Sequence, residues 1–272
     1  MTISVALRRR LIAGAAVAAL ALTGAACGGE TGGEVDGIKL VKAGKLTVCT
    51  HLPYKPFQYK EGDKVVGFDV DLLDLVAKDL GVTQTTVHIE WAQVTSGAAF
   101  KAKKCDMGMG AMTITDERAK AIGISDPYMD ATQVLLVKTD SPYKSLEDLK
   151  GKKVGVQKDT TGQDYAEEQA KTIGFTVVPF DDLTLLTNAV KAGKVDGGIN
   201  DNGVLYDFVN DNPDTAVVAE FDTGEQYGFA AKKDDPSGTK LLERFNKLLE
   251  KAKADGTYAK IYKKWFGVEP PK

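Results

Sequence analysis

Apolar and polar positions succeed one another along this chain in patterns that predict alternating strands and helices. Residues 70–80 carry apolar side chains at helical spacing, and Gly81 ends the segment. A further helix is expected over 96–103. Short apolar runs predict strands at residues 46–50, 87–91 and 107–112. The order strand, helix, strand, helix, strand indicates an open, largely parallel sheet covered by helices.

A second series of the same kind begins near residue 133. The apolar run 133–137 predicts an extended segment, and a helical segment follows at 240–266, divided by Gly256. Between residues 137 and 240, strands are expected at 154–156, 177–180 and 196–200, and helices at 145–150, 161–172, 183–191 and 202–210. We therefore expect an α/β protein of two lobes, with a ligand cleft where the carboxyl ends of the strands face each other.

The first residues have the pattern of an export signal. Arg8-Arg9-Arg10 precedes an apolar run at 11–22, and small residues continue to Cys27. The apolar run is shorter than the roughly 20 residues that a membrane span needs. We expect a signal peptide over 1–26 and an exported protein that does not itself cross the membrane.

Cys27 ends a segment that resembles a bacterial lipobox, in which the cysteine becomes the lipidated first residue. Gly24 departs from the pattern, which prefers a branched aliphatic residue there. The glycine-rich, polar residues that follow suit a flexible spacer. We expect a lipid anchor on Cys27 and a tether over 27–43. The alternative is an ordinary signal peptide with an incidental cysteine.

Composition narrows the range of partners. The chain is 43% hydrophobic and 27% charged, with a formal net charge of −3. An acidic balance argues against nucleic acid, because phosphate binding needs a basic patch. The two histidines and the remaining cysteines lack the spacing of a metal site, so neither a metal nor a cofactor is expected.

The remaining cysteines, Cys49 and Cys105, leave two alternatives open. An exported pair favours a disulfide. However, Cys49 lies late in one predicted strand and Cys105 at the start of another. If those strands are parallel neighbours in register, the separation argues against a bond.

Five segments in order carry a resemblance to a known family. The chain resembles the amino-acid-binding branch (family 3) of bacterial ABC-transporter extracellular solute-binding proteins, which includes glutamine-, histidine- and lysine/arginine-binding proteins. The resemblance covers about residues 45–267. The segments that carry it are Val66-Gly67-Phe68-Asp69-Val70-Asp71-Leu72, Met112-Thr113-Ile114-Thr115-Asp116-Glu117-Arg118, Ser125-Asp126-Pro127-Tyr128, Leu149-Lys150-Gly151-Lys152-Lys153-Val154-Gly155-Val156, and Asp255-Gly256-Thr257-Tyr258 leading to Lys264-Trp265-Phe266-Gly267.

The resemblance implies a two-lobe, periplasmic-binding-protein-like fold whose lobes are joined by two crossing strands, near 134–138 and 225–228. Lobe 1 would comprise 44–136 plus 228–272, and lobe 2 would comprise 137–227. It further implies a monomer, held at the cell membrane by its lipid anchor. Such a protein closes around a free, polar L-amino acid and delivers it to an ABC-transporter permease.

The same resemblance assigns partners to the ligand's backbone groups. Arg118 matches the carboxylate-binding arginine, and a guanidinium forms a two-pronged hydrogen bond with a carboxylate. Thr113 and Thr161 match contacts to that carboxylate from the two lobes. Asp201 matches the aspartate that binds the amine, and the carbonyl of Ala111 would be a second acceptor. For Asp201 and Thr161, helix capping is the alternative role.

The ligand side chain is less well specified. Tyr54 and Trp91 match positions where family members place aromatic rings around it. His51 stands where the basic-amino-acid binders and the glutamine binder carry an aspartate, and Gln157 faces the same region. Protonated His51 suits an acidic ligand and neutral His51 suits glutamine. A basic ligand would need an acid, for which Glu90 is the nearby candidate, so the amino acid stays undetermined.

Two other classes of function are alternatives to transport. A dehydratase-like enzyme on the same fold needs an acid/base residue in the cleft. His51 is the natural candidate, but no triad or paired carboxylate accompanies it, so we expect no enzymatic activity. A ligand-sensing receptor domain would be followed by a membrane span and a signalling module, and the sequence to Lys272 has neither.

Overall fold

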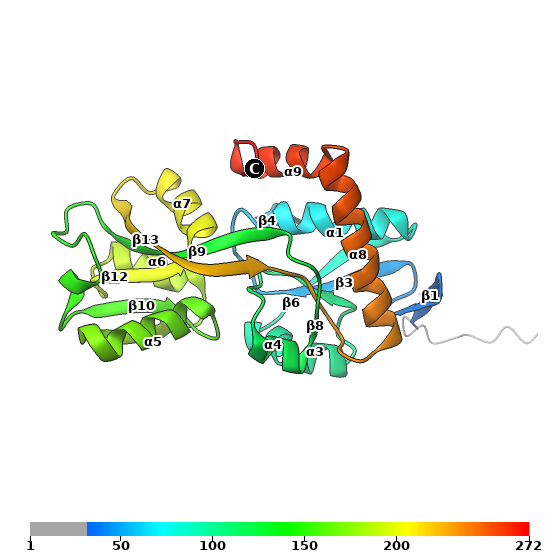
Figure 1. The fold of residues 1–272 in the computed structure, drawn as a ribbon, viewed down its shortest axis with the longest axis horizontal. Helices are drawn as coiled ribbons and strands as arrows, with labels where there is room; N and C mark the ends of the chain where they lie inside the picture. Colours follow the sequence, from blue (N-terminus) through cyan, green and yellow to red (C-terminus); the bar gives the residue numbers. More distant parts are fainter. Residues whose placement is uncertain (1–31, 272) are drawn as a thin grey trace, which may run out of the picture.

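The computed structural model describes residues 32–271, which form two lobes connected by long strands (Figure 1). The predicted signal peptide and Cys27 lie outside the described residues. Each lobe is built on a five-stranded sheet with helices packed against it. The predicted α/β class and the two-lobe arrangement are confirmed.

The sheet of the first lobe combines parallel and antiparallel pairs in the order β6-β3-β7-β14-β8. β3 pairs in parallel with β6 and β7, whereas β14 is antiparallel to both β7 and β8. Its strands are β3 (Lys45–Thr50), β6 (Thr83–His88), β7 (Met107–Gly108), β8 (Gly123–Ile124) and β14 (Ala230–Ala231). The sheet is therefore mixed, because a strand from the C-terminal part of the chain inserts between two early strands.

Six helices and two hairpins complete this lobe. The helices are α1 (Phe68–Asp79), α2 (Trp91–Thr95), α3 (Ala98–Lys101), α4 (Asp116–Ala121), α8 (Pro236–Ala254) and α9 (Thr257–Phe266). The hairpins are β1 (Gly33–Val35) with β2 (Ile38–Leu40), and β4 (Tyr59–Glu61) with β5 (Lys64–Val66). The helix predicted at 96–103 is the shorter α3, and an additional short helix, α2, begins at Trp91, where the end of a strand was expected.

The second lobe has the strand order β11-β10-β12-β9-β13. β10 pairs in parallel with β11 and β12, and β9 is antiparallel to β12 and β13. The strands are β9 (Met129–Lys138), β10 (Lys153–Gln157), β11 (Thr176–Phe180), β12 (Gly197–Asp201) and β13 (Thr215–Tyr227). The helices are the 3₁₀ turn η1 (Glu147–Leu149), α5 (Thr161–Ile173), α6 (Leu183–Lys191) and α7 (Asn202–Asp211).

Local capping explains where several helices begin and end. The Asp182 carboxylate accepts from Leu185 N at 2.7 Å and starts α6. Asp235 precedes Pro236 and accepts from two amides of the first turn of α8. Gly174 ends α5 in a left-handed conformation. These are the residue types that satisfy the unpaired groups at helix ends, which is why the limits predicted for α5 and α6 were close. α8 begins at Pro236, before the expected start at 240.

β9 and β13 are the connection between the lobes. They pair from Met129 opposite Tyr227 to Lys138 opposite Thr215, with register shifts between Val217 and Ala219 and between Phe221 and Glu225. Figure 1 shows them running from one lobe into the other. β9 begins at Met129, earlier than the crossing expected near residue 134. The pairing holds the two chain crossings together as one ribbon.

The prediction of a flexible tether is wrong for residues 33–40. This segment forms the β1–β2 hairpin, in which Ile38 and Leu40 are buried while Lys39 between them is exposed. Lys39 N donates to Ser237 Oγ of α8 at 3.0 Å. The alternating apolar residues bury against lobe 1, which a purely polar spacer could not do.

Cys49 and Cys105 form a disulfide, with 5.6 Å between their Cα atoms. The register explains why the bond is possible. Gly108 of β7 lies opposite Cys49, and the chain before β7 stays beside β3, with Asp106 N donating to Thr47 O at 2.8 Å. Cys105 therefore reaches Cys49 from just outside the ladder, and the open alternative is settled in favour of the bond.

Removing this disulfide should destabilise the protein. The bridge joins residues separated by 56 positions, so the Cys49→Ala/Cys105→Ala protein should lose roughly 2–4 kcal/mol of unfolding free energy. Urea titration followed by circular dichroism measures the loss. Cys27→Ser, which leaves the bridge intact, is the control, and equal stability of all three proteins would contradict the prediction.

Candidate functional site

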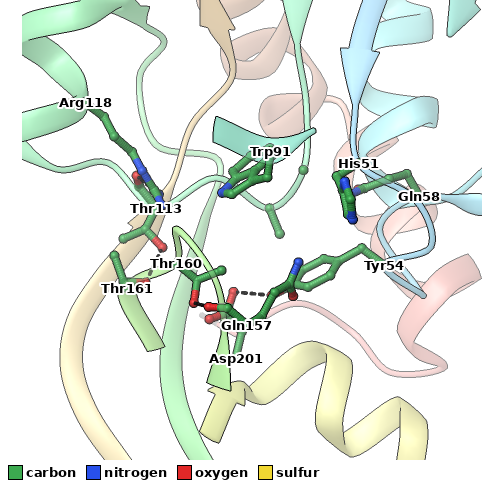
Figure 2. A pocket seen from close by; sticks show the side chains of 12 residues that line it. His51, Tyr54, Gln58, Trp91, Thr113, Arg118, Gln157, Thr160, Thr161 and Asp201 are labelled. Carbon is green, nitrogen blue, oxygen red and sulfur yellow. Dashed lines mark hydrogen bonds between the residues drawn. The ribbon is translucent and has the colours of Figure 1, made fainter. Parts of the chain in front are cut away.

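A cavity lies between the two lobes, and all nine predicted site residues line it (Figure 2). Three further lining residues were not predicted from the sequence. Gly110 and Thr160 adjoin predicted residues, and Gln58 lies in the loop after β3 that also carries Tyr54. The first lobe supplies His51, Tyr54, Gln58, Trp91, Gly110, Ala111, Thr113 and Arg118, and the second supplies Gln157, Thr160, Thr161 and Asp201. Glu90, the proposed partner for a basic side chain, is exposed and is not among them.

Arg118 provides a buried positive charge at one end of the cavity. Its position is set by α4, where Thr115 caps the helix by accepting from Arg118 N at 3.1 Å. Arg118 Nη1 donates to Thr113 O at 2.8 Å, and Nη2 donates across the lobes to Asp159 O at 3.2 Å. Burial lowers the pKa of the guanidinium, but the carboxylates of Asp201 and Glu225 oppose that shift. The group stays charged and suits a carboxylate.

The two predicted threonines meet from opposite lobes. Their Oγ1 atoms lie 3.2 Å apart, and each is also within hydrogen-bond distance of Glu225 Oε2, at 3.2 Å from Thr113 and 3.1 Å from Thr161. Gln133 Nε2 donates to the same oxygen at 3.0 Å. Glu225 and Gln133 were not predicted, because they come from the connecting strands, whose pattern shows only that they are extended.

Thr161 does not cap its helix. Thr160, one residue earlier, accepts from Gln163 N at 3.2 Å and performs that role. Thr161 therefore begins α5 with its hydroxyl toward Thr113 and Glu225, at a helix N-terminus where free N–H groups favour an anion. The capping alternative for Thr161 is excluded by this geometry.

Asp201 provides a buried carboxylate at the end of β12. Its Oδ2 accepts from Tyr54 Oη at 2.9 Å and Tyr227 Oη at 2.6 Å, and its Oδ1 accepts from Gln133 Nε2 at 2.7 Å. Burial raises the pKa of Asp201, whereas these three hydrogen bonds favour the ionised form. The side chain makes no capping bond to α7. A carboxylate held by neutral donors leaves its negative charge available to a cation in the cavity.

His51, Gln58 and Gln157 form the polar far side of the cavity. Figure 2 shows His51 and Arg118 at opposite ends with Trp91 between them. The Nδ1 atom of His51 lies 3.0 Å from Ile89 O. Gln157 Oε1 accepts from Asn200 Nδ2 at 3.3 Å. The cavity thus has a charged end and an uncharged polar end.

Asp69, from the Gly-Phe-Asp segment, shapes the loop that follows β7. The sequence suggested a strand up to residue 112, but β7 ends at Gly108. Asp69 Oδ2 accepts from Gly110 N at 3.1 Å and Ala111 N at 2.8 Å, and Oδ1 accepts from Tyr128 Oη at 2.8 Å. A side chain at residue 110 would meet the Trp91 ring at 2.6 Å, so glycine is required there. The carboxylate replaces the lost ladder bonds and directs the loop into the cavity.

Asp69 should make folding stability depend on pH. Burial raises its pKa to about 7, above the reference of about 3.9 for an unfolded chain. The folded state therefore binds this proton more tightly, and the group's contribution to stability falls as pH rises from about 4 to about 7. Between pH 5 and 8 the loss should be on the order of 2 kcal/mol.

Urea unfolding at pH 5 and pH 8 tests this for the wild type and Asp69→Asn. The variant should lack this part of the pH dependence, whatever its absolute stability. Asp63→Asn, in the exposed turn of the β4–β5 hairpin, should behave as the wild type. The same pH dependence in all three proteins would show that Asp69 is not responsible.

None of the helices in residues 32–271 combines the length and apolar character that a bilayer span requires. Within the same range, no three histidine, cysteine or acidic side chains cluster in a way that would hold a metal ion.

The chain matches a family model described as bacterial extracellular solute-binding proteins, family 3, over residues 46–268. The arginine-binding extracellular protein ArtP of Bacillus subtilis (strain 168) is 34% identical over 254 residues, covering 93% of this chain and 95% of the relative.

Solved structures agree with this match. An ancestral arginine-binding protein bound to arginine has a TM-score of 0.75 and 41% identity, covering 82% of this chain and 98% of that chain. The form bound to glutamine has the same score and identity, covering 83% and 99%. The ancestral amino acid-binding protein AncCDT-1, described as a precursor of cyclohexadienyl dehydratase, has a TM-score of 0.74 and 38% identity, covering 82% and 96%.

Proposed function

This chain belongs to the bacterial extracellular solute-binding proteins, family 3, and is the substrate-binding component of an amino-acid importer. For this component we propose a ligand, the residues that contact it and a membrane anchor. The ligand is a free, polar L-amino acid. Arg118, Thr113 and Thr161 bind its carboxylate, and Asp201 and the Ala111 carbonyl bind its ammonium. Tyr54 and Trp91 enclose its side chain, and His51 and Gln157 face the end of that side chain.

The observation that carries this proposal is the pair of opposite buried charges in one cavity. Arg118 and Asp201 are 9% and 5% exposed, yet no ion pair joins them among the described residues. Each is held instead by neutral groups, namely backbone carbonyls for Arg118 and two tyrosines and a glutamine for Asp201. A zwitterion that presents a carboxylate and an ammonium supplies the missing counter-charge to both.

Closure of the two lobes around the ligand follows because the contacts come from both lobes. Arg118 and Thr113 belong to the first lobe, and Thr161 and Asp201 to the second. Direct bonds such as Arg118 Nη2 to Asp159 O already cross between the lobes. A ligand that binds both lobes therefore favours the closed form over any form in which the lobes are apart. The closed protein is what the permease would recognise.

An enzymatic role has less support. AncCDT-1 is described as a precursor of a dehydratase, but it is itself described as an amino acid-binding protein. In the cavity, Asp201 already accepts three hydrogen bonds, and no second lining carboxylate in the described chain pairs with it as an acid or base. We propose binding and delivery without chemical conversion.

Arg118→Ala should abolish ligand binding without unfolding the protein. Removing one partner of a buried, hydrogen-bonded charge pair weakens binding by roughly 2–5 kcal/mol. Calorimetry against the twenty free amino acids identifies the ligand for the wild type and then measures the variant, with circular dichroism to verify folding. Arg244→Ala is the matched control, because Arg244 pairs with Asp36 and Asp79 on the outside of the first lobe. Retained affinity in folded Arg118→Ala would contradict the assignment.

We also propose that the protein is held at the cell membrane by a lipid on Cys27. The lipobox-like segment and the polar residues after it support this placement, although the structured part begins earlier than predicted, at β1. Mass spectrometry of the N-terminal peptide should give the mass of a diacylglyceryl cysteine at residue 27. Cys27→Ser should be released from membranes into the soluble fraction. An unmodified terminus at another residue would refute the anchor.

A further inference from the structure

Two buried polar atoms at the uncharged end of the cavity have no hydrogen-bond partner within the described part of the chain. They are His51 Nε2 and Gln58 Oε1, and both residues line the cavity. Gln58 is 1% exposed, so water outside the protein does not reach its side chain. A buried polar atom without a partner costs free energy. These two atoms are therefore placed to receive something that enters the cavity.

The role of His51 Nε2 is determined by the other ring nitrogen. Nδ1 lies 3.0 Å from the Ile89 carbonyl oxygen, and a carbonyl oxygen can only accept. Nδ1 therefore carries the proton, and Nε2 of the neutral ring presents a lone pair. The neighbouring His88 ring, 5.1 Å away, uses its Nδ1 to accept from Leu52 N.

The side chain of Gln58 places a second hydrogen-bond acceptor near His51 Nε2. Its backbone is held against Tyr54, with Tyr54 N donating to Gln58 O at 2.8 Å. Figure 2 shows the Gln58 side chain beside the His51 ring. The amide oxygen is the atom left without a partner. A glutamine amide can rotate to exchange its oxygen and nitrogen, whereas the contact of His51 Nδ1 with the Ile89 carbonyl fixes the orientation of that ring.

From this arrangement we propose that the site selects amino acids whose side chain ends in an –NH₂ group on a planar carbon. Both the amide of glutamine and the guanidinium of arginine have this end, which donates to His51 Nε2 and Gln58 Oε1. The inference rests on the function proposed above and narrows its ligand. A carboxylate, as in glutamate, would place its lone pairs against that of His51 and is rejected.

Neighbouring residues suit a planar donor. The Trp91 ring lies between the charged end and His51 in Figure 2 and offers a flat face to such a group. Asp201, the carboxylate among the lining residues of the described chain, is engaged with Tyr54, Tyr227 and Gln133. His51 and Gln58 can therefore accept hydrogen bonds from a ligand side chain whether or not that side chain carries a positive charge.

Calorimetry at pH 8 with glutamine, arginine, citrulline, glutamate and norvaline tests the proposal. Citrulline keeps the –NH₂ end of arginine without its charge, and norvaline has no donor. Glutamine or arginine should bind at least about tenfold more tightly than glutamate and norvaline, since an unpaired buried acceptor is costly. Tighter binding of glutamine identifies the amide as the favoured end. Tighter binding of arginine, with citrulline as its uncharged comparison, identifies the guanidinium.

His51→Leu provides the decisive variant. It removes the acceptor, so the preference for the favoured ligand over norvaline should fall by about tenfold or more. His88→Gln, next to His51 but outside the cavity lining, should leave that preference unchanged.

Two results would overturn the inference: glutamate binding as tightly as glutamine and arginine, or an unchanged preference in folded His51→Leu. If none of the twenty amino acids binds the wild type, the proposed function itself fails. That result is distinct from both of the others.

Discussion

The antiparallel pairing of β9 with β13 is the constraint on which the rest of this structure depends. It is the ribbon that joins two separately built sheets, and its residues also hydrogen-bond to side chains that line the cavity. Gln133 comes from β9, and Glu225 and Tyr227 come from β13. Because hydrogen bonds fix the register of the two strands, these side chains reach Asp201 and the two threonines together. The connection between the lobes is therefore also part of the site.

The cavity is lined by buried charges, and the groups around them show how that burial is tolerated. Burial raises the pKa of both Asp201 and Glu225, and the charge of Asp201 raises the pKa of Glu225 further. Neutral donors offset part of this cost: tyrosine hydroxyls, threonine hydroxyls and one glutamine amide that is shared between the carboxylates. Neutral donors orient the charges without cancelling them. A zwitterionic ligand then meets groups that need little rearrangement, and this favours tight and selective binding.

Support for the site extends well beyond the residues that line it. Asp69, on α1, holds the loop that carries Gly110 and Ala111, and Tyr128 connects the same carboxylate to the aromatic core through its stack on Phe229. The disulfide ties the strand before His51 to the segment before β7. Loops can hold binding residues accurately when buried polar contacts replace the ladder bonds that they lack.

Local patterns determined much of this protein by themselves. Apolar spacing and capping residues specified most helices and strands, because burial of one face and satisfaction of helix ends are decided within a few residues. The family resemblance, matched position by position, also located nine residues that line one cavity. Neither source revealed Gln58, Thr160, Gln133 or Glu225, since nothing in an extended strand or a loop indicates which side chain faces the cavity.

Only the tertiary structure decided how these pieces meet. Strand register and the course of the chain before β7 bring Cys105 to Cys49, which residue spacing left open. Packing on α8 made residues 33–40 a hairpin where the polar sequence suggested a tether. The tautomer of His51 follows from a carbonyl at residue 89, far along the chain. Each of these outcomes depends on contacts between residues distant in sequence, and such contacts form only when the whole chain has folded.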